Sequence, residues 1–322
     1  MKPVFTVLQS PTVFRFALSL LIAGIALAAT SGCTTTKIAA SKPGQITVVA
    51  TTTQMQDMVR NVGGGRVHLV GILKPNVDPH DFEPTPGTAV ALSGAKLIVE
   101  SGIGVDSWAD QLFESAASGT PVFVASDGLA VRPGDSAEPD GDPHWWHDPT
   151  LFEQAVGALA QRLGEIDPGG RAVYQHNADG YVARIQAMDR ANTQLIATVP
   201  QRQRKLVTNH DAFGYFAAHY GITIVGSVIP SLSTAAQPSA KSVANLIERI
   251  RAAHVKAIFT ESSLNPSLEE RIAAEAGVRV YANLYGDTLG PPGSPGATYI
   301  SMERWNMRAM VAGFLGTAPP AE

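Results

Sequence analysis

The sequence is short of cysteine, of charge and of long apolar runs, and each shortage excludes a class of protein. Cys33 is the only cysteine among 322 residues, so no disulfide can form within the chain. Charged residues make up only 16%, and the formal net charge of −4 comes without the basic stripe that binds nucleic acid. Hydrophobic residues make up 45%, which is typical of a globular chain, and the length suits two domains of ~150 residues each.

The N-terminus has the order of a secretory signal. Lys2 and Arg15 precede an apolar run from Phe16 to Ala29, which is shorter than the ~20 residues that a transmembrane helix needs. Small residues then lead to Cys33, and this stretch resembles a bacterial lipobox, although Thr30 replaces the usual leucine. We therefore expect a lipid anchor on Cys33 and an extracytoplasmic protein held at the cell membrane. A plain secretory signal with an incidental cysteine is the alternative.

Beyond the N-terminus, short apolar β-rich runs alternate with helical stretches, which is typical of α/β proteins with mostly parallel sheets. The predicted strands are Ile46–Ala50, Val67–Ile72, Lys96–Glu100, Pro121–Ala125, Lys205–Thr208, Ile222–Val225, Ala257–Thr260 and Val278–Ala282. A long amphipathic stretch from Asp167 to about Pro200 separates the two series and predicts one helix that is long enough to span a domain.

We therefore predict an α/β fold of two lobes, each with a mostly parallel sheet flanked by helices, joined by one long rigid helix. The predicted boundaries are a signal peptide at 1–33, a tether at 34–43, an N-terminal lobe at 44–166, the linking helix at 167–199 and a C-terminal lobe at 200–322.

The tripeptide Asp-Pro-His occurs twice, ending at His80 and at His144. Proline fixes the backbone just before each imidazole and favours an extended conformation in the preceding aspartate. Neutral imidazole is the commonest protein ligand for metal ions, so a metal ion is the first candidate for what these loops hold.

His210 and Asp287 extend this set into the second series. Ligands of parallel α/β sheets bind beyond the carboxyl ends of the strands. His80, His210 and Asp287 each follow a predicted strand, and His144 lies in the loop that ends the first lobe. Three imidazoles and one carboxylate would form a four-coordinate site with two ligands from each lobe.

Five motifs, taken together in this order, resemble the metal-binding lipoproteins of bacterial ABC importers for zinc and manganese. They are Pro79-His80-Asp81-Phe82-Glu83-Pro84-Thr85-Pro86, Asp142-Pro143-His144-Trp145-Trp146, Asn209-His210-Asp211-Ala212-Phe213-Gly214-Tyr215-Phe216, Phe259-Thr260-Glu261-Ser262, and Asp287-Thr288-Leu289-Gly290 before Ala297-Thr298-Tyr299.

The resemblance covers essentially the whole mature chain. It implies two α/β lobes joined by a rigid helix, with a metal ion bound between them by His80, His144, His210 and Asp287. It also implies a solute-binding protein rather than an enzyme, which delivers the ion to an ABC permease. We expect a monomer.

Four further residues are candidates to assist the site. His147 stands where this motif commonly has an apolar residue, three positions from His144, and could help deliver the ion or replace a ligand, although a helix start directly after it argues against this role. Glu261 is either a hydrogen-bond partner of a ligand or simply a carboxylate at a strand end. Asp81 and Glu83 are candidates to hydrogen-bond a ligand imidazole, which metal sites usually require.

The donor set favours Zn²⁺ over Mn²⁺. Zinc readily takes nitrogen-rich tetrahedral sites, whereas manganese prefers more oxygen ligands. In the resembling family a glutamate at the position of His210 tends to mark manganese binders. Zinc-specific members often carry a long His-rich loop, however, and the matching segment here, from Arg132 to Asp142, is short and acidic. We expect one divalent ion, with zinc first and manganese second.

Two other functions remain open at this stage. A metal-dependent adhesion or sensing lipoprotein would share the binding site but not the permease. A zinc metallohydrolase would keep an open coordination position for water on three protein ligands, which four ligands disfavour.

Overall fold

The first half of the chain builds a four-stranded parallel sheet in the order β2-β1-β3-β4, as seen in a computed structural model that describes residues 41–320. The predicted signal peptide and Cys33 lie outside the described residues. The strands are β1 (Ile46–Ala50), β2 (Val67–Gly71), β3 (Leu97–Glu100) and β4 (Val122–Val124). All three pairings are parallel, so the carboxyl ends of the strands meet at one edge of the sheet.

Side chains of the central strands alternate between two cores, as the period of two in a strand requires. Val48 and Leu97 face the larger core, which includes residues of helices α2 (Thr53–Gly63) and α5 (Pro149–Ile166). Val49 and Ile98 face a smaller core with α3 (Pro86–Ser93) and α4 (Asp110–Ala116). Helices on both faces explain why these strands read as continuous apolar runs.

The second half holds two parallel strand pairs instead of one continuous sheet. They are β5 (Lys205–Thr208) with β6 (Thr223–Ser227), and β7 (Ala257–Glu261) with β8 (Arg279–Leu284), and β5 lies beside β7. Each pair contains a shift in register. The helices of this half are α7 (Gly214–Tyr220), α8 (Ala240–Ala252), α9 (Ser267–Ala276) and α10 (Tyr299–Leu315).

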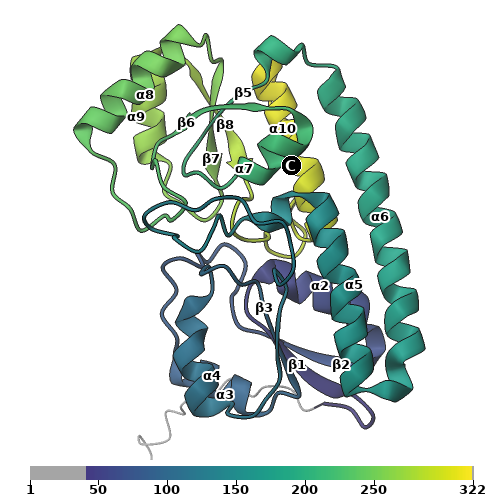
Figure 1. The fold of residues 1–322 in the computed structure, drawn as a ribbon. Helices are drawn as coiled ribbons and strands as arrows, with labels where there is room; N and C mark the ends of the chain where they lie inside the picture. Colours follow the sequence, from purple (N-terminus) through teal and green to yellow (C-terminus); the bar gives the residue numbers. More distant parts are fainter. Residues whose placement is uncertain (1–40, 321–322) are drawn as a thin grey trace, which may run out of the picture. The chain divides into compact units, whose positions relative to one another are not determined.

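The helix α6 (Arg171–Ala197) runs beside both lobes (Figure 1). It begins after a 3-10 turn at Pro168–Gly170, and its buried residues recur every three or four positions. It packs against α2 and α5 of the first lobe and against α10 of the second. Parallel sheets flanked by helices, with one long helix between the lobes, confirm the predicted fold class.

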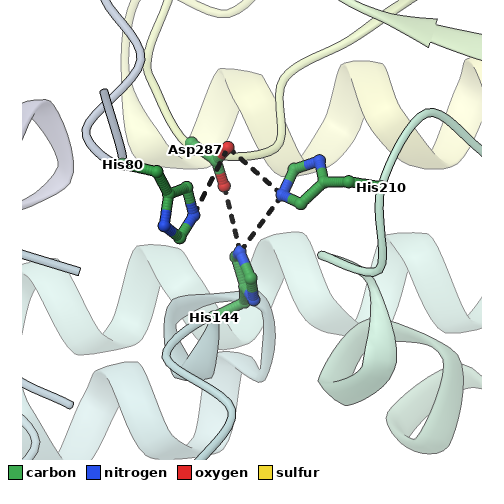
Figure 2. Close-up of side chains that lie close together, drawn as sticks. All are labelled: His80, His144, His210 and Asp287. Carbon is green, nitrogen blue, oxygen red and sulfur yellow. Dashed lines mark hydrogen bonds and ion pairs between the residues drawn. The ribbon is translucent and has the colours of Figure 1, made fainter. Parts of the chain in front are cut away.

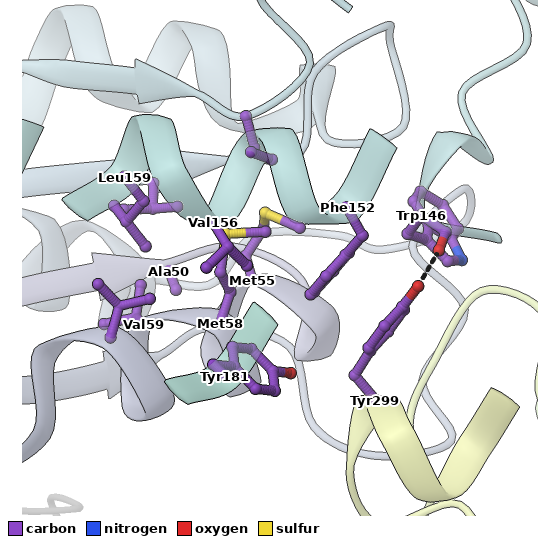
Figure 3. Packing of buried hydrophobic residues seen from close by; sticks show 14 of the residues in the cluster. Ala50, Met55, Met58, Val59, Trp146, Phe152, Val156, Leu159, Tyr181 and Tyr299 are labelled. Carbon is purple, nitrogen blue, oxygen red and sulfur yellow. Dashed lines mark hydrogen bonds between the residues drawn. The ribbon is translucent and has the colours of Figure 1, made fainter. Parts of the chain in front are cut away.

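Helix α10 adds a second connection between the lobes. Tyr299, its first residue, stacks on Phe152 of α5 with ring centroids 3.7 Å apart and planes only 5° from parallel. The Tyr299 hydroxyl also donates to the carbonyl oxygen of Trp146 at 2.8 Å (Figure 3). The C-terminal helix therefore contributes to the core of the first lobe.

None of the helices between residues 41 and 320 has the length and apolar character needed to cross a membrane.

Candidate metal site

Four side chains from four separate loops converge: His80, His144, His210 and Asp287 (Figure 2). One nitrogen or oxygen atom of each lies within 4.8 Å of the corresponding atoms of the other three. His80 follows β2, His210 follows β5 and Asp287 follows β8, whereas His144 directly precedes the 3-10 turn η3 (Trp145–His147). Each half of the chain contributes two of the four side chains.

Asp287 faces all three imidazoles. Its Oδ1 lies 3.1 Å from Nε2 of His144, and its Oδ2 lies 3.3 Å from Nε2 of His210 and 3.9 Å from Nε2 of His80. The Nε2 atoms of His144 and His210 are 3.3 Å apart. Within residues 41–320, neither oxygen of this buried carboxylate has a hydrogen-bond partner, and neither does Nε2 of His80. Buried polar atoms without partners are costly, and a cation between them would satisfy all of them.

Asp142 holds His144 by both its backbone and its ring. One oxygen, Oδ1, accepts from the backbone nitrogen of His144 at 3.1 Å and lies 2.8 Å from its Nδ1. The side chain of His144 is completely buried. Nδ1 is thereby engaged outside the cluster, and Nε2 is left to face Asp287.

Glu261, at the end of β7, holds His210 in the same way. Its Oε1 lies 3.2 Å from the backbone nitrogen and 2.9 Å from Nδ1 of His210. Both side chains are completely buried. Glu261 is thus a hydrogen-bond partner of the candidate ligand His210.

His80 is held more loosely than the other two imidazoles. Asp78 accepts from its backbone nitrogen at 2.9 Å, as Asp142 does for His144, but Nδ1 lies 3.4 Å from Oε1 of Glu138. The side chain of His80 is 2% exposed, and it lines a cavity of about 1010 Å³ together with Glu138. His80 is therefore the imidazole of the cluster beside an open cavity.

The cluster shifts the pKa values of its members. Burial disfavours the charged imidazole of His144, but Asp142 and Asp287 outweigh this effect and raise its pKa to about 9. Burial likewise opposes charge on His210, while Asp287 and Glu261 raise its pKa well above the usual range. Burial disfavours the Asp287 carboxylate, but the neighbouring histidines hold its pKa well below the usual range. The negative carboxylate of Asp287 therefore favours the protonated imidazoles of His144 and His210, and a metal ion would replace those protons.

The remaining candidate residues lie away from the shared centre. Both ring nitrogens of His147 are engaged, Nδ1 with Glu303 at 2.8 Å and Nε2 with the carbonyl of Gly286 at 3.1 Å. Asp81 and Glu83 are exposed, and neither forms a hydrogen bond to an imidazole within residues 41–320.

Instead, Asp142 hydrogen-bonds the imidazole of His144, and Glu138 lies 3.4 Å from Nδ1 of His80. The sequence motifs predicted neither contact. A signal for Asp142 was present: an aspartate two residues before a histidine can accept from its backbone N–H in an Asx turn. Glu138 belongs to the short acidic segment, where no motif singles it out.

With this geometry established, known proteins provide a comparison. The ZnuA family, described as zinc-uptake complex component A, periplasmic, matches residues 48–313. The manganese-binding lipoprotein MntA of Halalkalibacterium halodurans is 28% identical over 302 residues, which cover 93% of this chain and 98% of MntA. The metal ABC transporter substrate-binding lipoprotein ScbA of Streptococcus cristatus is 28% identical over 311 residues, with coverage of 93% and 98%. The structure of the periplasmic zinc-binding protein TroA from Treponema pallidum superposes with a TM-score of 0.79 at 29% identity, covering 84% of this chain and 99% of TroA.

Proposed function

The chain belongs to the ZnuA family of periplasmic zinc-uptake components, and from this premise we propose that it captures one divalent metal ion and delivers it to an ABC permease. The family consists of solute-binding proteins and not of enzymes, as the sequence predicted. In this proposal the ion is the cargo, and His80, His144, His210 and Asp287 are its ligands.

The convergence of four metal-binding side chains carries the proposal. The three Nε2 atoms and the Asp287 carboxylate face one another. The Nδ1 atoms of His144 and His210 point to carboxylates outside the cluster, which fixes the ring orientation and makes Nε2 a better ligand. Four protein donors close a tetrahedral shell, so the arrangement favours holding an ion over hydrolysis on it.

We propose zinc as the physiological ion, with manganese second. Three nitrogen donors and one oxygen donor suit Zn²⁺, whereas Mn²⁺ prefers a shell richer in oxygen. The names of the relatives do not separate the two ions, because MntA is named for manganese and TroA for zinc. The donor set of this chain is therefore the argument for zinc.

Elemental analysis of protein loaded from equal concentrations of zinc and manganese tests both parts of the proposal. We expect one zinc ion per chain and little manganese. Protein that retains manganese but no zinc from this mixture would contradict the metal assignment. Protein that retains neither ion would contradict the proposed function. X-ray absorption on the loaded protein should find four protein donors; three donors and a water molecule would favour a metallohydrolase.

We further propose that a lipid on Cys33 anchors the protein to the outer face of the cell membrane, beside its permease. The relatives MntA and ScbA are named lipoproteins, and the second is named for an ABC transporter. Labelling with a radioactive fatty acid should mark the wild-type protein and not Cys33→Ser. Deletion of the gene should lower zinc uptake, whereas unchanged zinc and manganese uptake would favour adhesion or sensing.

A further inference from the structure

His147 lies at the junction of three loops that carry the candidate ligands. It is completely buried in η3, three residues after His144. Its Nε2 contacts the carbonyl oxygen of Gly286, the residue before Asp287. Its ring stacks on Phe213, three residues after His210, with centroids 4.7 Å apart and planes 27° from parallel. One side chain thus contacts the loops of His144, His210 and Asp287.

The partners of His147 determine which of its nitrogens carries a proton. A carbonyl oxygen can only accept, so Nε2 is protonated and donates to Gly286 at 3.1 Å. Nδ1 then shares one proton with Glu303, 2.8 Å away on α10. Either an imidazolium donates to the carboxylate, or the carboxylic acid donates to a neutral ring. The pair has no net charge in either form, which suits its complete burial.

The Gly286 carbonyl is a fixed point of the Asp287 loop. Besides His147, the indole Nε1 of Trp146 donates to it at 3.0 Å. Gly286 itself has no room for a side chain, because a Cβ atom there would collide with Oε2 of Glu261. The peptide that leads into Asp287 is therefore clamped between the two donors from η3 and the carboxylate that holds His210.

We propose that His147 is a positioning residue for Asp287: it fixes the Gly286 carbonyl from the first lobe, and Glu303 fixes His147. This inference rests on the proposed metal-binding function. Groups that orient a ligand without contacting the ion change metal affinity by about 10–100-fold when they are removed. Both ring nitrogens of His147 have hydrogen-bond partners in a completely buried site, so the side chain does more there than fill space.

A pair of amide substitutions separates positioning from simple packing. In His147→Gln the amide nitrogen reaches about as far as Nε2 and can still donate to Gly286, whereas the shorter amide of His147→Asn reaches only as far as Nδ1. Titration of the full chain with Co²⁺ reports the affinity, and the visible absorption bands of bound Co²⁺ report the ligand geometry. His219→Asn is the control, since His219 pairs with Asp148 and Asp189 and not with the Gly286 carbonyl.

We expect His147→Asn to weaken Co²⁺ binding by about 10–100-fold and to alter the absorption bands. His147→Gln and His219→Asn should keep the wild-type bands. An unchanged His147→Asn, or equal losses in both amide variants, would overturn the inference while leaving the proposed function intact. A wild-type chain that does not bind Co²⁺ would overturn the proposed function and this inference with it.

A measurement on the wild-type protein covers the case in which the variants do not fold. Nitrogen-15 NMR of the His147 ring should show a protonated Nε2 both with and without metal. An unprotonated Nε2 would overturn the inference.

Discussion

One oxygen of Glu261 holds both the backbone and the ring of His210, at 3.2 Å from the nitrogen of the first and 2.9 Å from Nδ1 of the second. Glu261 thereby fixes where the loop after β5 places its imidazole. We predict that Glu261→Ala weakens zinc binding by about 10–100-fold, because the ring loses its orientation and its basicity. Competition with a chromophoric chelator measures the affinity.

Glu275→Ala is the matched control, because Glu275 is exposed on α9. Its zinc affinity should equal that of the wild type. Equal affinity in both variants would show that Glu261 does not support the site.

Metal binding should stabilise the fold through the four-residue cluster. At ~100 times its dissociation constant, a ligand that binds only the native state contributes about 2.7 kcal/mol to the free energy of unfolding. We predict that His144→Ala largely removes this gain, since it deletes one of the proposed ligands. His176→Ala, at an exposed position on α6, should keep it. Denaturant unfolding with and without zinc distinguishes them, and equal gains would contradict the site assignment.

Metal affinity and the stability of the metal-free protein should respond to pH in opposite directions. The pKa of His144 is raised to about 9, so this imidazole is protonated near neutral pH and binding must displace its proton. Zinc affinity should therefore rise with pH up to about 9.

The stability of the metal-free fold should fall as pH rises, whereas the zinc affinity should rise. A histidine whose folded pKa exceeds the unfolded value of ~6.5 contributes stability that is complete below that value and is lost as pH rises through the folded pKa. The His144 contribution should thus decline between about pH 6.5 and 9. Calorimetry of the metal-free protein across this range tests the decline, which should be smaller in His144→Ala, because His210 also has a raised pKa and still contributes.

The ion preference should depend on the donor atom at position 210. We predict that His210→Glu lowers the ratio of zinc to manganese affinity, because it replaces a nitrogen donor with oxygen, which manganese favours. Glu261 would then face a carboxylate in place of Nδ1, so the affinity for both ions should fall. Competition between the two ions, read by elemental analysis, gives the ratio, and an unchanged ratio would contradict the prediction.

The stack of Phe152 on Tyr299 should contribute strongly to stability. Phe152 is completely buried in the core of the first lobe, and its ring lies against the first residue of α10. We predict that Phe152→Ala lowers the free energy of unfolding of the metal-free protein by about 3–5 kcal/mol through the cavity that it leaves. Val173→Ala, at a residue that is 42% exposed on α6, should change it by less than about 0.5 kcal/mol. Urea denaturation measures both.

The strands and the convergence of ligand loops were predictable because they depend on local patterns. Apolar runs mark strands such as β1, and the rule that ligands lie beyond the carboxyl ends of parallel strands placed His80, His210 and Asp287 at one site. The pairing of the second-lobe strands was harder to predict, because no sequence pattern near the strands indicates the register shifts in both pairs.

The surroundings of the four converging side chains were harder to predict than their convergence. His147 stands close to His144 in sequence, which suggested a direct role, yet its ring nitrogens are bound by Gly286 and Glu303, 139 and 156 residues further along the chain. Asp81 is closer to His80 in sequence than Glu138, but only Glu138 contacts the imidazole. Which residue contacts each imidazole depends on tertiary packing. Sequence neighbours alone do not predict these contacts.

The order of the four converging side chains along the chain also sets when the cluster can form during synthesis. Asp287 comes last, and it is the carboxylate that faces every imidazole of the cluster. A chain synthesised only as far as α9 (Ser267–Ala276) holds three histidines without their common counter-charge. The complete cluster can therefore form only after almost the whole polypeptide is available to fold.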